Sequence, residues 1–111
     1  MAYDEELADR LRVQLAGLGD LTEKKMFGGL AFLVGGNMAI AASGQGGLLV
    51  RVDPAESDAL VAATGAETAV MRGRPMSGWL RVTSEQVADD AALVAWVDRS
   101  TSYVGSLPKK G

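Results

Sequence analysis

The segment MFGGLAFLVGGNMAIAAS, residues 26–43, decides the fold of this chain. It contains two short apolar runs, residues 30–34 and 38–42, on either side of Gly35-Gly36-Asn37. Short apolar runs separated by a cluster of turn residues are typical of adjacent strands in a hairpin. Glycine and asparagine tolerate the positive φ angles that a tight reversal needs. The segment therefore predicts an antiparallel hairpin.

Further strands are expected on both sides of this hairpin. Residues 21–27 precede a break at Gly28-Gly29, and residues 48–52 follow a glycine-rich break at 44–47, which predicts a four-strand antiparallel meander. Neighbouring residues of a strand point to opposite faces, so one of Lys24 and Lys25 should face a helix layer or lie at a sheet edge. Lysines at an edge usually prevent aggregation between strands, and we prefer this structural interpretation to a functional one.

A first helix is predicted over residues 4–18. Leu7, Leu11, Leu15 and Leu18 recur at spacings of four, four and three, which places them on one stripe of a helix. We therefore expect a surface helix that packs these leucines onto the sheet.

The second helix has a clear start and a clear end. Asp53 can cap it, Pro54 fits its first position, and Glu56 stands where a capping-box residue reaches back. Gly65 is expected to end it.

The third helix is expected to follow Thr83, which with Gln86 also fits a capping box. Its apolar face is predicted to consist of Leu93, Trp96, Val97, Ser100 and Val104. Tryptophans in such patterns usually pack in the core, so Trp96 and Trp79 are expected to be core anchors.

Residues 67–71 and 79–82 predict two more strands, and the glycine- and proline-containing residues 72–78 predict a loop between them. The expected order is then α-β-β-β-β-α-β-β-α. It indicates an α+β fold, a two-layer sandwich with a mostly antiparallel sheet and helices on one face. Residues 1–107 are expected to form a single domain, with a flexible tail at 108–111.

The composition excludes several kinds of chemistry. The 111 residues include no cysteine and no histidine, which removes thiolate nucleophiles, the commonest zinc ligands and a serine triad of the usual kind. The net charge of −3 argues against direct binding to nucleic acid, which depends on phosphate neutralisation. The acidic N-terminus does not resemble a signal peptide, and no apolar run approaches the ~20 residues of a membrane span. A cytoplasmic protein is expected.

Two patterns that could carry chemistry favour a structural interpretation. The glycine clusters at 35–36 and 44–47 lie between strands, without the lysine and following helix that a phosphate-binding loop requires. Asp89-Asp90 could contribute to a metal site or to a carboxylate mechanism, but acidic residues are also favoured in the first turn of a helix by its dipole. We prefer the second explanation.

Arg72 and Arg74 are the best candidates for recognition of an anion or a partner. The guanidinium group binds carboxylate or phosphate through two parallel hydrogen bonds, and a loop can present it. Loops are polar by default, so two solvated charges remain the competing and preferred interpretation.

The chain resembles the N-terminal domain of the TfoX/Sxy family. The resemblance rests on Met26-Phe27-Gly28-Gly29, Phe32, Gly36-Asn37-Met38, the start of the second helix and Trp96-Val97, and it covers residues 3–104. It implies a two-layer α+β domain similar to type III secretion-chaperone-like folds. The matching residues imply a structural motif, and the resemblance implies no catalytic residue and no cofactor.

The resemblance also implies a function. The best-known members of the TfoX/Sxy family are regulators of natural competence that act with the cyclic-AMP receptor protein, and they carry a second domain after this one. We therefore expect a stand-alone, non-enzymatic interaction domain that regulates transcription through protein partners. Contacts are expected at Lys24, Lys25, Arg72 and Arg74, and a homodimer could form through an exposed sheet edge. The alternative is a domain that binds a small molecule or an anion with Arg72 and Arg74.

Overall fold

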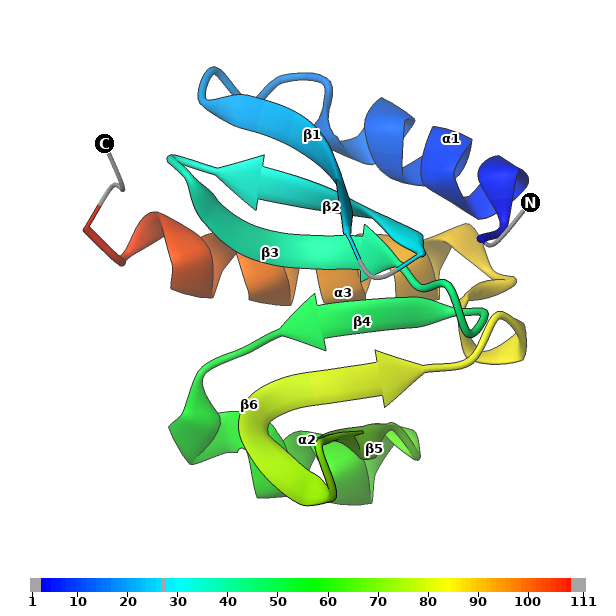
Figure 1. Ribbon diagram of the computed structural model, residues 1–111, viewed down its shortest axis with the longest axis vertical. Coiled ribbons are helices and arrows are strands. Elements are labelled where there is room, and N and C mark those ends of the chain that lie inside the picture. Colours follow the sequence, from blue (N-terminus) through cyan, green and yellow to red (C-terminus); the bar gives the residue numbers. More distant parts are fainter. Residues whose placement is uncertain (1–2, 27, 109–111) are drawn as a thin grey trace.

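Six strands form one antiparallel sheet in the order β1-β2-β3-β4-β6-β5 (Figure 1). A computed structural model of the chain describes residues 3–26 and 28–108. The strands are β1 (Leu21–Met26), β2 (Gly29–Val34), β3 (Asn37–Ala42), β4 (Leu48–Arg51), β5 (Glu67–Met71) and β6 (Arg74–Val82). The predicted α+β order of strands and helices is confirmed.

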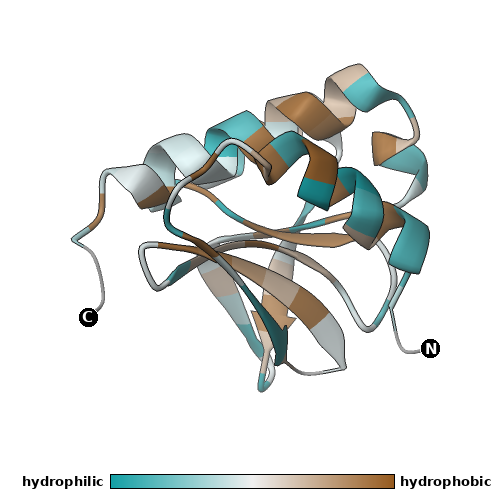
Figure 2. Ribbon diagram, turned by 90° about the horizontal axis from the view of Figure 1, so that it is seen from above, coloured by the Kyte–Doolittle hydropathy of each residue, from teal (hydrophilic) through white to brown (hydrophobic). Residues whose placement is uncertain are grey.

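Three α-helices and two short 3₁₀ turns complete the fold. They are α1 (Glu5–Leu15), η1 (Pro54–Glu56), α2 (Ser57–Thr64), η2 (Glu85–Val87) and α3 (Asp90–Gly105). Seen from above, the helices lie on one side of the sheet and leave the other side open, as predicted (Figure 2). None of the helices in the described part of the chain is both long and apolar enough to cross a bilayer.

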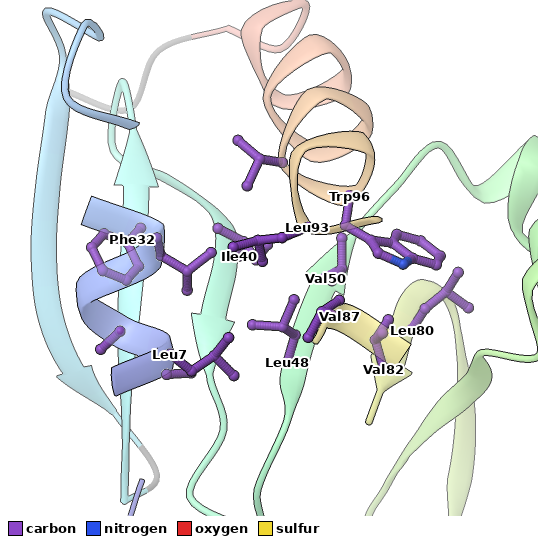
Figure 3. Packing of buried hydrophobic residues seen from close by; sticks show 14 of the residues in the cluster. Leu7, Phe32, Ile40, Leu48, Val50, Leu80, Val82, Val87, Leu93 and Trp96 are labelled. Carbon is purple, nitrogen blue, oxygen red and sulfur yellow. The ribbon is translucent and has the colours of Figure 1, made fainter. Parts of the chain in front are cut away.

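The core lies between the helices and the covered face of the sheet. Alternate strand residues, among them Phe32, Ile40 and Leu48, point toward Leu7 of α1 and Leu93 of α3 (Figure 3). All five residues predicted on the apolar face of the third helix are buried, and Trp96 is only 3% exposed. The closely packed layer that results holds the strands in register.

Helix α1 is shorter than predicted. Asp4 caps it by accepting a hydrogen bond from the backbone N–H of Leu7, and Leu7, Leu11 and Leu15 are buried as expected. The helix ends at Leu15, before Gly17 and Gly19, so Leu18 leaves the stripe and is 37% exposed. The prediction that Leu18 packs on the sheet was wrong because the leucine spacing continues past the end of the helix.

A 3₁₀ turn precedes each of the other two helices. The Asp53 carboxylate caps η1 by accepting from the N–H of Ala55, and Gly65 ends α2 with a φ of 79°. The predicted capping box of Thr83 and Gln86 is present, since each side chain accepts a hydrogen bond from the other residue's N–H, but it lies at the start of η2 and not of α3. Helix α3 itself begins later, at Asp90.

The turn of the central hairpin is tighter than predicted. Gly35 and Gly36 both have positive φ angles, 59° and 83°, and they form a two-residue connection. Asn37 is already the first residue of β3, and its side-chain amide donates to the Pro108 carbonyl oxygen at 2.9 Å. Of the predicted tail, only Pro108 is described, and the remainder lies outside the described residues.

Two predictions near β6 were wrong. Residues 74–78 are strand rather than loop, because Met71 pairs with Arg74 and Val70 pairs with Pro75, which leaves a two-residue turn at Arg72-Gly73. Trp79 is half-buried and absent from the core, because strand alternation turns it away from the helices while Leu80 and Val82 face them.

A candidate binding groove on the open face of the sheet

The open face of β4 and β6 carries an alternating set of apolar and basic side chains. The strand register places Leu49 opposite Arg81 and Arg51 opposite Trp79. The Arg51 guanidinium lies over the Trp79 ring, 5.2 Å from its centroid, and 5.8 Å from that of Tyr103. The Arg51 guanidinium is therefore engaged in stacking on these two rings, whereas Arg81 lies beside Leu49.

Gly78 shapes the outer half of β6. It has a φ of 86°, its carbonyl oxygen accepts from the N–H of Val52 at 2.8 Å, and its own N–H donates to the Ser57 hydroxyl at 3.4 Å. A positive φ within a strand produces a bulge and a bend. Beyond this bend the β5–β6 hairpin curls away from the rest of the sheet (Figure 1).

The curled hairpin and the β3–β4 connection enclose a groove of about 800 Å³ on the open face, which we call the arginine groove. Its lining residues are Ser43, Gln45, Leu49, Ala69, Val70, Met71, Arg72, Arg74, Met76 and Arg81. The two arginines singled out in the sequence therefore lie together, and a third one joins them.

The arginines of the groove differ in how they are held. Arg81 donates a hydrogen bond to the side-chain oxygen of Gln45. Arg72 and Arg74 are exposed and have no hydrogen-bond or ion-pair partner among residues 3–26 and 28–108. None of the described lining residues is acidic. The groove thus offers two guanidinium groups, those of Arg72 and Arg74, that are free to bind an anionic group.

The remaining lining is apolar. Leu49 forms part of it, and Val70, Met71 and Met76 have exposed fractions of 63%, 38% and 36%. Large apolar side chains that gather at one exposed place are typical of an interaction site. A ligand that fits must therefore satisfy both charge and apolar surface.

Lys24 and Lys25 are not part of this groove. They lie on β1, the edge strand at the opposite end of the sheet from β5, and both are exposed. Lys24 pairs with Ala31 and Lys25 with Leu30, so the two side chains point to opposite faces as predicted. An edge position agrees with the expected protection of that edge. Because these lysines lie at the opposite edge from the groove, the contact that we propose below involves the arginines and not Lys24 or Lys25.

The motif residues that carry the resemblance occupy structural positions. Phe32 is fully buried, and Asn37 is 4% exposed. Gly28 has a φ of 76°, and a Cβ atom on Gly29 would lie 2.4 Å from the Ala42 carbonyl oxygen. Met26 ends β1, Gly36 completes the hairpin turn and Trp96 packs in the core, whereas Phe27 lies outside the described residues. These positions explain the motif by packing and turn geometry.

Asp89 and Asp90 have structural partners. Asp89 caps α3 by accepting from the N–H of Ala91 at 2.9 Å, and Asp90 pairs with Arg10 at 2.8 Å. No group of three or more histidine, cysteine, aspartate or glutamate residues within the described chain could hold a metal ion. The structural explanation of this acidic pair therefore accounts for both side chains.

Sequence reasoning missed several groove residues, namely Arg81, Leu49, Val70, Met71 and Met76. A signal for Arg81 was present in the sequence. Side chains alternate between the two faces of a strand, so a basic residue between two apolar core residues must face the open side. The position of Leu49 next to it follows only from the pairing of β4 with β6.

The fold and the groove define a small two-layer α+β domain with a basic and apolar groove on the open side of its sheet. The model of the TfoX N-terminal domain family matches residues 13–103, from within α1 to near the end of α3. The chain belongs to this family. The comparison with curated proteins and the comparison with solved structures each gave no match.

Proposed function

We propose that this chain is a non-enzymatic, cytoplasmic interaction domain that regulates transcription by binding protein partners. The family assignment supports a regulatory role. The absence of histidine and cysteine from the sequence supports a role without catalysis, because it removes the commonest general base and the most reactive nucleophile.

The single observation that carries the proposal is the arginine groove. Interaction sites between proteins are enriched in arginine and methionine and contain exposed apolar side chains. The groove combines the free Arg72 and Arg74 with Val70, Met71 and Met76. A protein segment can contact all of these groups at once.

An affinity pull-down from native lysate at moderate salt tests the proposal. The test variant carries Arg72→Asn and Arg74→Gln, since asparagine tolerates the positive φ of 53° at Arg72. The matched control carries Lys24→Gln and Lys25→Gln, which removes the same charge at the opposite edge. We expect a protein of the transcription machinery to be recovered by the wild type and the control and lost by the arginine variant. Equal recovery by all three would refute a role for the groove.

A small anionic ligand is the second candidate. It is favoured by one observation, three guanidinium groups in a groove whose described lining residues include no acidic one. A ligand that binds only the folded state raises the melting temperature. A thermal-shift screen of anionic metabolites tests this candidate. A shift in the wild type that disappears in the arginine variant would support it, and no shift with any metabolite would exclude it.

A further inference from the structure

The fold separates positive from negative charge. In the described chain, the strands and their turns carry six basic residues and three acidic ones. The basic ones are Lys24, Lys25, Arg51, Arg72, Arg74 and Arg81, and the acidic ones are Asp20, Glu23 and Glu67. The helices and their N-terminal caps carry most of the acidic residues and only Arg10, Arg12 and Arg99 as basic ones. Although the net charge is −3, the strands and their turns therefore carry a net positive charge. Such a separation favours binding of an acidic partner in one orientation.

The groove requires more than negative charge from its occupant. Leu49, Val70, Met71 and Met76 make much of its surface apolar. A phosphate backbone would pair with the arginines and leave this apolar surface in water. None of the lining residues in the described part of the chain is aromatic, so a base would find no ring to stack on. A peptide with both carboxylate and apolar side chains satisfies both kinds of surface.

We propose that the arginine groove binds an acidic segment of the partner in which carboxylate side chains are interspersed with apolar ones. The carboxylates pair with Arg72, Arg74 and Arg81, and the apolar side chains pack against Leu49, Val70 and Met76. The inference rests on the proposed function only in taking the occupant to be part of a protein partner.

Direct binding of synthetic peptides to the full chain tests this proposal. The probe is a fluorescein-labelled peptide in which glutamate alternates with leucine, measured by fluorescence anisotropy. In one comparison peptide glutamine replaces every glutamate, and in another alanine replaces every leucine. A labelled single-stranded oligonucleotide is the third comparison. These probes separate charge, apolar contact and affinity for polyanions.

Variants of the protein complete the experiment. The Arg72→Asn/Arg74→Gln variant should bind the glutamate–leucine peptide roughly tenfold more weakly, as expected for the loss of two partly exposed charge pairs. The Val70→Thr/Met76→Gln variant keeps the charge and should also bind more weakly. The Lys24→Gln/Lys25→Gln control should bind as the wild type does. Circular dichroism and thermal melting of each variant show that it is folded.

Several outcomes would overturn the inference. The first is binding of the glutamate–alanine peptide as tight as that of the glutamate–leucine peptide. The second is tighter binding of the oligonucleotide than of any peptide, which would make the groove a nucleic-acid site. The third is self-association that disappears in the arginine variant, which would make a second copy the occupant. Failure of the peptides while the pull-down still depends on Arg72 and Arg74 would leave the proposed function intact.

Discussion

Gly29 shows how a single missing side chain allows a close approach between segments. A Cβ atom there would lie 2.4 Å from the Ala42 carbonyl oxygen and 3.0 Å from the Gly44 nitrogen, and both are backbone atoms that cannot rotate away. The glycine of the family motif is therefore required by packing where β2 passes β3.

We expect Gly29→Ala to lower the free energy of unfolding by about 1–3 kcal/mol, the usual cost of overpacking. Urea denaturation measures the change. Gly105→Ala is the control, because a Cβ atom there meets no atom within 4 Å. A Gly29→Ala variant as stable as the wild type would show that the close approach of the Ala42 carbonyl oxygen does not require glycine at this position.

Arg72 is the only non-glycine residue of the described chain with a positive φ, at 53°, and Gly73 follows with 75°. Two positive φ angles are the signature of a type I′ turn, for which Asn-Gly is the preferred pair. An arginine in this conformation is strained, which is unexpected unless its charge has a use.

We predict that Arg72→Asn stabilises the protein by about 0.5–1 kcal/mol, because asparagine adopts this conformation more easily. Thermal denaturation measures the gain, and Arg74→Asn, in a strand, should show none. Stabilisation together with weaker peptide binding would indicate that Arg72 is kept for binding. Loss of stability in Arg72→Asn would contradict the assignment of strain.

At the scale of the elements, a bidentate ion pair connects α1 to β1. The Arg12 Nε and Nη2 atoms each donate to one oxygen of the Glu23 carboxylate, at 2.9 Å. These hydrogen bonds hold the pKa of Glu23 below its usual value. Both side chains are more than one third exposed, so the contribution to stability is small.

The pair predicts a pH dependence. Because the pKa of Glu23 is lower in the folded state, its contribution is fully present above the unfolded value near 4.3 and is lost as the pH falls through the folded value. The stability difference between the wild type and Glu23→Gln should shrink as the pH falls below about 5 in urea denaturation. Glu67→Gln, on β5, is the control. A difference that is constant with pH would exclude this role of the pair.

At the scale of the whole molecule, the two edges of the sheet are unlike. The β1 edge carries Lys24 and Lys25, whereas β5 contains no lysine or proline and exposes Val70. Lysine and proline are the usual protection of an edge against pairing with another strand. If the expected homodimer forms, β5 is the edge that the structure leaves open for it.

We therefore expect the mass measured by light scattering to rise with concentration for the wild type and to stay at the monomer value for Val70→Lys. The added lysine should prevent pairing of two β5 strands by charge repulsion. Lys24→Val, on the opposite edge, should not reduce association. A wild-type protein that is monomeric at all working concentrations would remove the homodimer.

Much of the fold could be predicted from local patterns. The hairpin at Gly35-Gly36, the leucine stripe of α1 and the apolar face of α3 depend on turn chemistry and on the periods of strand and helix, which neighbouring residues determine. Residues 74–78 were misassigned because Pro75 and Gly78 are locally typical of loops. Pairing with β5 and a bulge at Gly78 keep them in the sheet.

The sequence by itself determined the order of the elements, the absence of thiol and imidazole chemistry, and Arg72 and Arg74 as candidates for recognition. Only the tertiary structure decided that these arginines line one groove with Leu49 and Arg81 and that Lys24 and Lys25 lie at the opposite edge of the sheet. The reason is that strand order and register join residues far apart in the chain, while periodicity and turn chemistry act only between neighbours.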